Sequence, residues 1–243
     1  MSKFKHDTGE IWNGDCLELM KQIPDESIDM ILCDLPYGTT ACKWDTVIPF
    51  EPLWEQYLRI TKPRAAIVLT AQTPFDKILG CSQIKHLKYE WLWEKNKPTG
   101  HLNSKKQPMK SHENVLVFYR NKPVYNPQMT QGKKYKPCGG ASKLDNYGNF
   151  SSIRENNGSL RYPLSIQRFN VESGIHPTQK PVALFEYLIR TYTNEGDWVL
   201  DNCSGSGTTA IAAHRTGRLS LCIEKDLGYF LASCGRVWGE QNA

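Results

Sequence analysis

The sequence has no long apolar run and no paired cysteines. No stretch of its 243 residues approaches the roughly 18 apolar residues of a membrane-spanning helix, and residues 1–7 contain no apolar core of a secretory signal. The eight cysteines are scattered without a Cys-x-x-Cys pair, so we expect no zinc or other metal site. Several lie in apolar runs, where a free thiol behaves as a small hydrophobic group. These absences favour a cytoplasmic protein with reduced thiols.

Acidic residues are nearly absent from the middle of the chain. Between Lys95 and Lys143 there are eleven Lys and Arg residues and one acid, Glu113. The remaining residues carry nineteen basic and twenty-four acidic side chains. Such a confined basic segment is typical of a surface that binds a polyanion. A solvated, lysine-rich loop is the alternative, but the interleaved tyrosines, asparagines and glycine pair favour nucleic acid.

Apolar runs and helical periodicities alternate along the chain. The apolar runs predict strands at 10–13, 28–33, 65–70, 87–93, 113–119, 197–201 and 219–224. The helical pattern predicts helices at 15–22, 51–60, from Thr73-Pro74 with Pro74 at the first position, from Pro181, at 208–215 and at 227–238. Alternating strands and helices predict an α/β fold with a Rossmann-like, mostly parallel sheet and helices on both faces.

Periodicity fades from Asn121 to about Gly174. This stretch is rich in Asn, Gly, Lys, Pro and Ser and has few apolar residues. We interpret it as a loop-rich insertion at 121–174. The flanking segments, 1–120 and 175–243, then form two halves of one domain.

The first chemical motif, Asp34-Leu35-Pro36-Tyr37-Gly38, directly follows the predicted strand at 28–33. A carboxylate and a backbone carbonyl can accept both hydrogens of an amino group, and an aromatic ring can stack on a planar base. The motif therefore suits a base that carries an exocyclic amino group. Taken alone, Pro-Tyr-Gly is also ordinary turn chemistry after a strand.

The second motif follows the strand that ends at Asp201. Its sequence is Asn202-Cys203-Ser204-Gly205-Ser206-Gly207-Thr208-Thr209-Ala210. The order strand, Gly-x-Gly-x-x-Ala, helix is that of a cofactor loop: the glycines permit a tight turn and a close backbone approach, and Ala210 permits close helix packing. Glu224, which ends the next strand, is placed to bind ribose hydroxyls.

A nicotinamide-binding unit is the competing interpretation of the second motif. Only nineteen residues follow Glu224, too few to complete a dinucleotide-binding sheet. The strands before the loop must therefore supply the rest of the sheet, and the first motif has no natural role in hydride transfer.

Together the motifs resemble the amino-group DNA methyltransferases that use S-adenosylmethionine. Asp34 to Tyr37 is similar to their Asp-Pro-Pro-Tyr motif, with Leu35 replacing the first proline. Asp201 to Gly207 is similar to their Asp-Pro-Phe-x-Gly-x-Gly loop, from which Asn202 and Cys203 depart. Three further segments resemble the family: Asn13 to Cys16, His112 to Phe118 and His176 to Pro181. The catalytic motif precedes the variable region and the cofactor loop, which is the permuted, beta-type order.

The resemblance implies site-specific methylation of adenine N6 in double-stranded DNA by base flipping, with S-adenosylhomocysteine as product. It makes 1–120 the catalytic half, 121–174 the target-recognition region and 175–243 the cofactor-binding half. The implied catalytic residues are Asp34, Leu35 through its carbonyl, Pro36 and Tyr37. The implied cofactor-binding residues are Asp15, Cys16, Asp34, Thr178, Lys180, Asp201, Cys203, Ser204, Gly205, Gly207, Thr208, Glu224 and Lys225.

Two basic zones are the candidate DNA contacts, the loop 96–111 with its flanks and the insertion. The candidates are Lys95, Lys97, Lys105, Lys106, Lys110, Lys133, Lys134, Lys136, Lys143, Arg154, Arg161 and Arg168. The motif's aspartate favours adenine, since a serine there is more typical of cytosine N4 enzymes. An N4-cytosine enzyme and a non-catalytic DNA-binding relative remain alternatives. The oligomeric state, with a homodimer as one form, and a cognate restriction enzyme as partner stay open.

Overall fold

The computed structural model describes residues 2–39, 42, 45–133, 159–172 and 179–242. The chain divides into a main unit, Met1–Asn126 with Ser165–Ala243, and a second unit, Pro127–Leu164. The second unit falls within the predicted insertion. Its described part contains an antiparallel pair of two-residue strands, β7 (Thr130–Gln131) and β8 (Leu160–Arg161).

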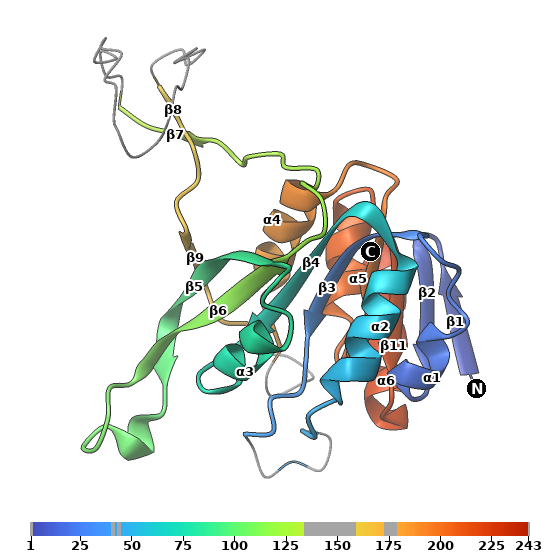
Figure 1. Ribbon diagram of the computed structural model, residues 1–243, viewed down its shortest axis with the longest axis horizontal. Helices are drawn as coiled ribbons and strands as arrows, with labels where there is room; N and C mark the ends of the chain where they lie inside the picture. Colours follow the sequence, from blue (N-terminus) through green and yellow to red (C-terminus); the bar gives the residue numbers. More distant parts are fainter. Residues whose placement is uncertain (1, 40–41, 43–44, 134–158, 173–178, 243) are drawn as a thin grey trace. The chain divides into compact units, whose positions relative to one another are not determined.

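The main unit is built on one nine-stranded sheet in the order β1-β2-β11-β10-β3-β4-β6-β5-β9 (Figure 1). The strands are β1 (Ser2–His6), β2 (Gly9–Asn13), β3 (Ile28–Asp34), β4 (Thr61–Ala71), β5 (Leu87–Thr99), β6 (Lys110–Phe118), β9 (Ile166–Phe169), β10 (Trp198–Asp201) and β11 (Leu219–Glu224). Only β1 and β6 run against the other strands of this sheet. The predicted mostly parallel sheet is therefore confirmed.

Strands from the two ends of the chain interleave in this sheet. β10 and β11 belong to the C-terminal part, yet they pair between β2 and β3 of the N-terminal part. The strands before the glycine loop thus complete the sheet.

Helices cover both faces of the sheet, as the sequence predicts. The helices are α1 (Cys16–Met20), α2 (Phe50–Ile60), α3 (Phe75–Ser82), α4 (Val182–Tyr192), α5 (Thr208–Arg215) and α6 (Leu227–Gln241). The first three pack in one apolar cluster and the last three in another. β3 shows why: Met30 and Leu32 face the cluster of α4–α6, whereas Ile31 and Cys33 face the cluster of α1–α3. No helix in the described part of the chain is long and apolar enough to cross a membrane.

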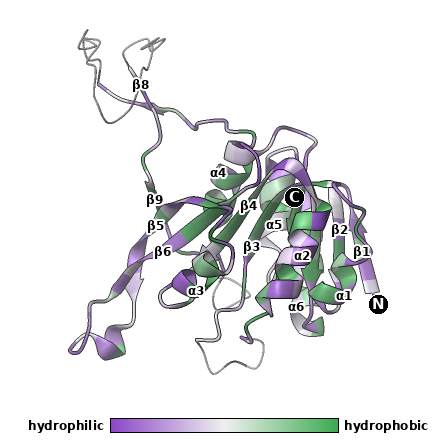
Figure 2. Cartoon of the chain, viewed as in Figure 1, coloured by the Kyte–Doolittle hydropathy of each residue, from purple (hydrophilic) through white to green (hydrophobic). Residues whose placement is uncertain are grey.

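The hairpin of β5 and β6 extends beyond the edge at which β3 and β4 end. β4 ends at Ala71, opposite Asn114, whereas β6 begins at Lys110 and β5 continues to Thr99. A short 3₁₀ helix, His101–Asn103, lies in the connection. Figure 2 shows that the outer part of the hairpin is hydrophilic. The predicted loop at 96–111 is therefore wrong at both ends, because ladder pairing continues where the apolar pattern has stopped.

Two strands of the main sheet were not predicted, and the helices α1, α3 and α4 each begin one residue later than expected. β1 and β9 are edge strands with few apolar residues, so they lack the pattern that marks buried strands. Pro74 caps α3 from outside instead of occupying its first turn.

The core around β3 yields a stability prediction. Ile31 is fully buried, so Ile31→Ala removes apolar contacts and leaves a cavity. We expect the free energy of unfolding to fall by about 2–5 kcal/mol in urea titrations. Ile84, which is 67% exposed, is the control, and Ile84→Ala should change it by less than about 0.5 kcal/mol. Equal effects of the two substitutions would contradict this packing.

Candidate functional site

The candidate site lies where the parallel strands β3, β10 and β11 end. Their carboxyl ends surround a cavity of about 590 Å³. After β10 the chain enters α5 on one face, and after β3 it continues to α2 on the other. This divergence creates the crevice in which open α/β sheets bind ligands.

The cavity collects most residues that the sequence assigns to the cofactor and to catalysis. Its lining includes Asp15, Cys16, Asp34, Leu35, Pro36, Tyr37, Lys180, Asp201, Cys203, Ser204, Gly205, Thr208, Glu224 and Lys225. Gly207 is not among the lining residues and has a packing role described below. Thr178 lies outside the described residues.

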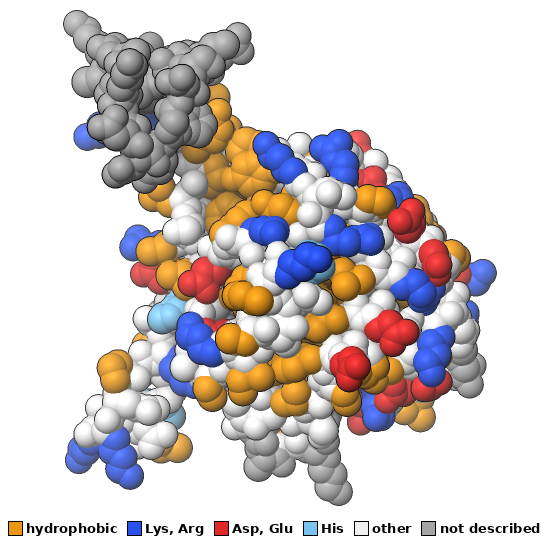
Figure 3. Space-filling model, viewed as in Figure 1, with side chains coloured by type: hydrophobic (Ala, Val, Ile, Leu, Met, Phe, Trp, Pro, Cys, Tyr) orange, Lys and Arg blue, Asp and Glu red, His pale blue; other side chains and the backbone are white. Residues whose placement is uncertain are grey.

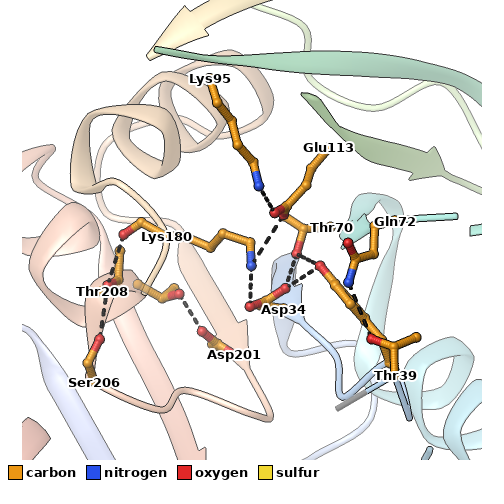
Figure 4. A network of polar contacts seen from close by, with 12 residues as sticks. Asp34, Thr39, Thr70, Gln72, Lys95, Glu113, Lys180, Asp201, Ser206 and Thr208 are labelled. Carbon is orange, nitrogen blue, oxygen red and sulfur yellow. Dashed lines mark hydrogen bonds and ion pairs between the residues drawn. The ribbon is translucent and has the colours of Figure 1, made fainter. Parts of the chain in front are cut away.

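The Asp34 carboxylate ends β3 and accepts three hydrogen bonds from the described part of the chain. Its Oδ1 accepts from the Tyr37 hydroxyl at 2.6 Å and from the Thr70 hydroxyl. Its Oδ2 accepts from Lys180 Nζ at 2.5 Å (Figure 4). The Asp34 carboxylate is therefore held by donors from three segments: the turn that follows β3, the strand β4 and Lys180.

Lys180 is a buried ammonium between two carboxylates. Its side chain is 5% exposed. Its Nζ forms ion pairs with Asp34 Oδ2 and, at 3.4 Å, with Glu113 Oε2. Burial alone would lower the pKa of Lys180, but the charges of Asp34 and Glu113 outweigh it and raise the pKa. Lys180 is thus paired with acids, which differs from its expected place at the cofactor carboxylate.

Lys95 is paired with Glu113 and is 7% exposed. The expectation that Lys95 contacts DNA is therefore wrong, because its ammonium is buried against a carboxylate. Burial alone would raise the pKa of Glu113, but Lys180 and Lys95 outweigh it and lower the pKa. Glu113 is accordingly an ionised carboxylate between two cations.

Tyr37 packs its ring beside the Asp34 carboxylate. The ring stacks on Phe75, with centroids 5.1 Å apart and planes at 30°. Burial, with the neighbouring charge of Asp34, raises the pKa of the Tyr37 hydroxyl well above its usual range, so it acts as a donor. The side chain of Leu35 is buried in the apolar cluster of α1–α3.

The glycine loop connects β10 to α5 and is tied to Glu224. Gly205 N donates to Glu224 Oε2, and Asp226 N donates to Glu224 Oε1, both at 2.8 Å. Burial raises the pKa of Glu224. Gly207 has φ +76°, and a Cβ there would lie 3.0 Å from the Ser233 Cβ of α6. Glycine at 207 therefore satisfies both the left-handed turn and the close approach of α6.

Side chains of α5 and α2 anchor the residues at the end of β10. Asp201 Oδ2 accepts from the Thr209 hydroxyl at 2.5 Å, and Oδ1 accepts from Cys203 N at 3.1 Å. Burial raises the pKa of Asp201 to about 6. The Tyr57 hydroxyl donates to Asn202 Oδ1 at 2.5 Å, which fixes the loop to α2.

The cavity also contains polar groups without a partner among the described residues. Ser204 Oγ and Gln179 Oε1 are buried and make no hydrogen bond there. A buried hydroxyl or amide is costly to leave unsatisfied. Together with the glycine loop and Glu224, these groups fit a polar nucleoside cofactor. The described residues include no cluster of three His, Cys, Asp or Glu side chains that could hold a metal ion.

The candidate DNA contacts fall into different settings. Exposed lysines on the outer hairpin are Lys97, Lys105, Lys106 and Lys110, and Figure 3 shows basic side chains gathered at its tip. Arg168 of β9 is exposed but pairs with Glu94 at 2.6 Å. Lys133 and Arg161 belong to the second unit. Lys134, Lys136, Lys143 and Arg154 lie outside the described residues.

Three residues in or beside the site were not singled out from the sequence: Glu113 and Gln179 line the cavity, and Thr70 donates to Asp34. Glu113 is the only acid in the basic segment, and that isolation was a usable signal. Thr70 ends a predicted strand beside the one that carries Asp34, so parallel pairing could have indicated it. Gln179 has no local signal beyond its position in the His176 to Pro181 segment.

Comparison with known proteins identifies the family. A sequence model described as DNA methylase, of the N6/N4 methyltransferases, matches residues 28–233. Because this match covers most of the sequence, the chain belongs to the N6/N4 DNA methylase family.

Individual relatives agree with this assignment. The type II methyltransferase M.BamHI of Bacillus amyloliquefaciens is 26% identical over 255 residues, covering 95% of this chain and 56% of M.BamHI. The chain spans less than two thirds of the length of the curated relatives it matches first. The crystal structure of an M1.HpyAVI–SAM complex has a TM-score of 0.66 at 24% identity, covering 94% of this chain and 98% of that one. The cytosine-N4-specific PvuII DNA methyltransferase has a TM-score of 0.70 at 16% identity, covering 98% and 93%.

The raised pKa of Asp201 predicts a pH dependence of stability. The folded state holds the proton up to about pH 6, whereas the ordinary value is 3.8. Asp201 therefore contributes stability that is complete below about pH 4 and lost as pH rises through about 6. Between about pH 4 and 7, the free energy of unfolding should fall by about 3 kcal/mol more in the wild type than in Asp201→Asn. Denaturant titrations across this range measure it, and parallel curves for the two proteins would contradict it.

Proposed function

We propose that this chain transfers a methyl group from S-adenosylmethionine to the exocyclic N6 of adenine in double-stranded DNA, at a specific sequence. The observation that carries the proposal is the shared cavity. The Asp34-Leu35-Pro36-Tyr37 motif and the loop tied to Glu224 come from opposite ends of the chain, yet both line it. A base-modifying group and a nucleoside-binding loop thus face one space.

Asp34 and the carbonyl of Leu35 act on the target base. The amino group of adenine is a poor nucleophile because its lone pair is delocalised into the ring. Accepting its two hydrogens moves the nitrogen toward a tetrahedral form with an available lone pair. The family's cofactor supplies an electrophilic methyl group on a sulfonium, and positioning with charge placement provides most of the catalysis.

Tyr37 supports a base that has left the duplex. Extrusion of a base costs about a few kcal/mol, which stacking and pocket hydrogen bonds must offset. The Tyr37 ring is held by Phe75 and lies in the cavity lining beside Asp34. A flat, pre-positioned ring costs little entropy when it stacks on the base.

The cofactor is held by the loop and by Glu224. The carboxylate of Glu224 accepts the ribose hydroxyls by exchanging its present backbone donors. Ser204 Oγ and Gln179 Oε1 obtain the partners that they lack. Asp15 caps α1 and pairs with Lys225 at 3.1 Å, and we propose that it contacts the adenine end of the cofactor.

Specificity for adenine is supported by the aspartate at position 34, since a serine there is more typical of cytosine N4 enzymes. Cytosine N4 is the second candidate, favoured by the similarity of the fold to the cytosine-N4-specific PvuII enzyme. The outer hairpin and the second unit are proposed to contact DNA in the cytoplasm, the second unit as target-recognition region. A homodimer and a cognate restriction enzyme are further proposals, the latter supported by the name type II methyltransferase of the relatives.

Asp34→Asn tests the reaction. Asparagine keeps the shape but replaces one acceptor oxygen by a donor, so we expect methyl transfer to fall at least about 100-fold with cofactor binding retained. Labelled methyl transfer to unmethylated duplex DNA, with mass spectrometry of the bases, measures this. The control is Asp29→Asn, near the other end of β3, where Asp29 pairs with Lys62. In the wild-type chain, label in N4-methylcytosine would overturn the adenine assignment, and cofactor binding without methyl transfer would overturn the reaction.

Lysines of the outer hairpin test DNA binding. Lys105 and Lys106 are exposed, and phosphate contacts release counterions. Lys105→Gln with Lys106→Gln should weaken binding alike on all sequences and reduce the slope of log K against log salt by about 2. Fluorescence anisotropy at several salt concentrations measures it. The matched control is Lys85→Gln with Lys88→Gln, around the start of β5; an equal effect there would contradict a role for the hairpin.

A further inference from the structure

Four charged side chains of alternating sign form a chain that ends at the catalytic carboxylate. Lys95 pairs with Glu113, Glu113 lies 3.4 Å from Lys180, and Lys180 lies 2.5 Å from Asp34 (Figure 4). Lys95 belongs to β5, Glu113 to β6 and Asp34 to the end of β3, whereas Lys180 lies just before α4. Two positive and two negative charges therefore balance in a site where three of the side chains are at most 11% exposed.

The hydrogen bonds of Asp34 leave one oxygen with spare capacity. A carboxylate oxygen has about two lone-pair positions. Oδ1 uses both, for the hydroxyls of Tyr37 and Thr70. Among the described residues, Oδ2 has one donor, Lys180. A base amino group can therefore reach a free lone pair on Oδ2, and only a displaced hydroxyl would free one on Oδ1.

We propose that Lys180 and Glu113 are positioning residues, which hold Asp34 so that Oδ2 presents its remaining lone pair to the target amino group, with Lys95 fixing Glu113. The inference rests on the function proposed above for Asp34. It assigns Lys180 and Lys95 to the chemistry of the target base, instead of to the cofactor and to DNA phosphates.

Glu113 is needed because an ammonium has three donors. The contact with Glu113 draws Lys180 away from a second bond to Asp34. Without that contact, Lys180 donates a second hydrogen bond to Asp34. That bond occupies the lone pair of Oδ2 that the base amino group requires. Lys95 keeps Glu113 in place from the far side, so that Glu113 does not follow Lys180. Each buried charge of this chain fixes the position of its neighbour, because the loss of one partner leaves the next charge uncompensated.

The experiment compares Glu113→Gln, Lys180→Met and the double variant Lys95→Met/Glu113→Gln in single-turnover methyl transfer on preformed complexes. Asp29→Asn is the control, an ion pair of β3 that lies outside the cavity lining. We expect Glu113→Gln and Lys180→Met to slow transfer about 10- to 100-fold, because small misplacement of a reacting group is costly. Dissociation constants for S-adenosylmethionine and DNA should stay within about twofold of the wild type.

The double variant separates positioning from other roles. It removes one positive and one negative charge together, so it keeps the balance and the pair of Lys180 with Asp34. We expect it to be no slower than Glu113→Gln alone, since residues of one network are not additive. A double variant that is clearly slower than Glu113→Gln alone would mean that Lys95 acts independently and would overturn the proposal.

The remaining outcomes are also decisive. Wild-type single-turnover rates in Glu113→Gln, or a loss explained by weaker cofactor or DNA binding, would overturn the positioning role while leaving the proposed function intact. A wild-type chain that binds both ligands but transfers no methyl group would instead overturn the proposed function and this inference with it.

Discussion

The parallel pairing of β10 with β3 is the constraint from which the site follows. Val199 lies opposite Met30 and Leu200 opposite Ile31, so the two strands end at the same edge of the sheet. Each strand then ends in an aspartate, Asp201 or Asp34. Because the helices that follow lie on opposite faces, the space between the two strand ends stays open. A segment from the C-terminal part and one from the N-terminal part thereby share one cavity.

The two aspartates at this edge have different hydrogen-bond partners. Asp201 is buried with neutral donors, and its pKa is raised to about 6. Asp34 instead faces the Lys180 ammonium, whose charge is itself supported by Glu113. A neutral-donor environment suits a loop anchor, whereas a charge-paired carboxylate that lines the cavity and is 22% exposed is accessible to a ligand. The difference comes from neighbours on other elements, not from the aspartates themselves.

Local signals predicted the elements that bury apolar residues around the motifs. The helix at Thr208–Arg215 and the strand at Leu219–Glu224 match the predicted bounds, because glycines and apolar runs delimit them. The edge strands β1 and β9 escaped prediction, since their stability comes from pairing and not from their own pattern. The charge pattern instead predicted an exposed side chain that is not exposed. Lys95 has the same local signal as the exposed lysines, and its tertiary contact with Glu113 is what distinguishes it.

The departure from the family's loop sequence has a structural compensation. Asn202 stands where the family has proline, which would restrict the backbone without help. Here the Asn202 side chain accepts from Tyr57 of α2, so a tertiary hydrogen bond replaces the local restraint. The loop is thus fixed from the face of the sheet that also carries α3 and Phe75, the support of Tyr37. The glycine loop and the Tyr37 ring consequently share one packed layer, so we expect a disturbance of that layer to displace both.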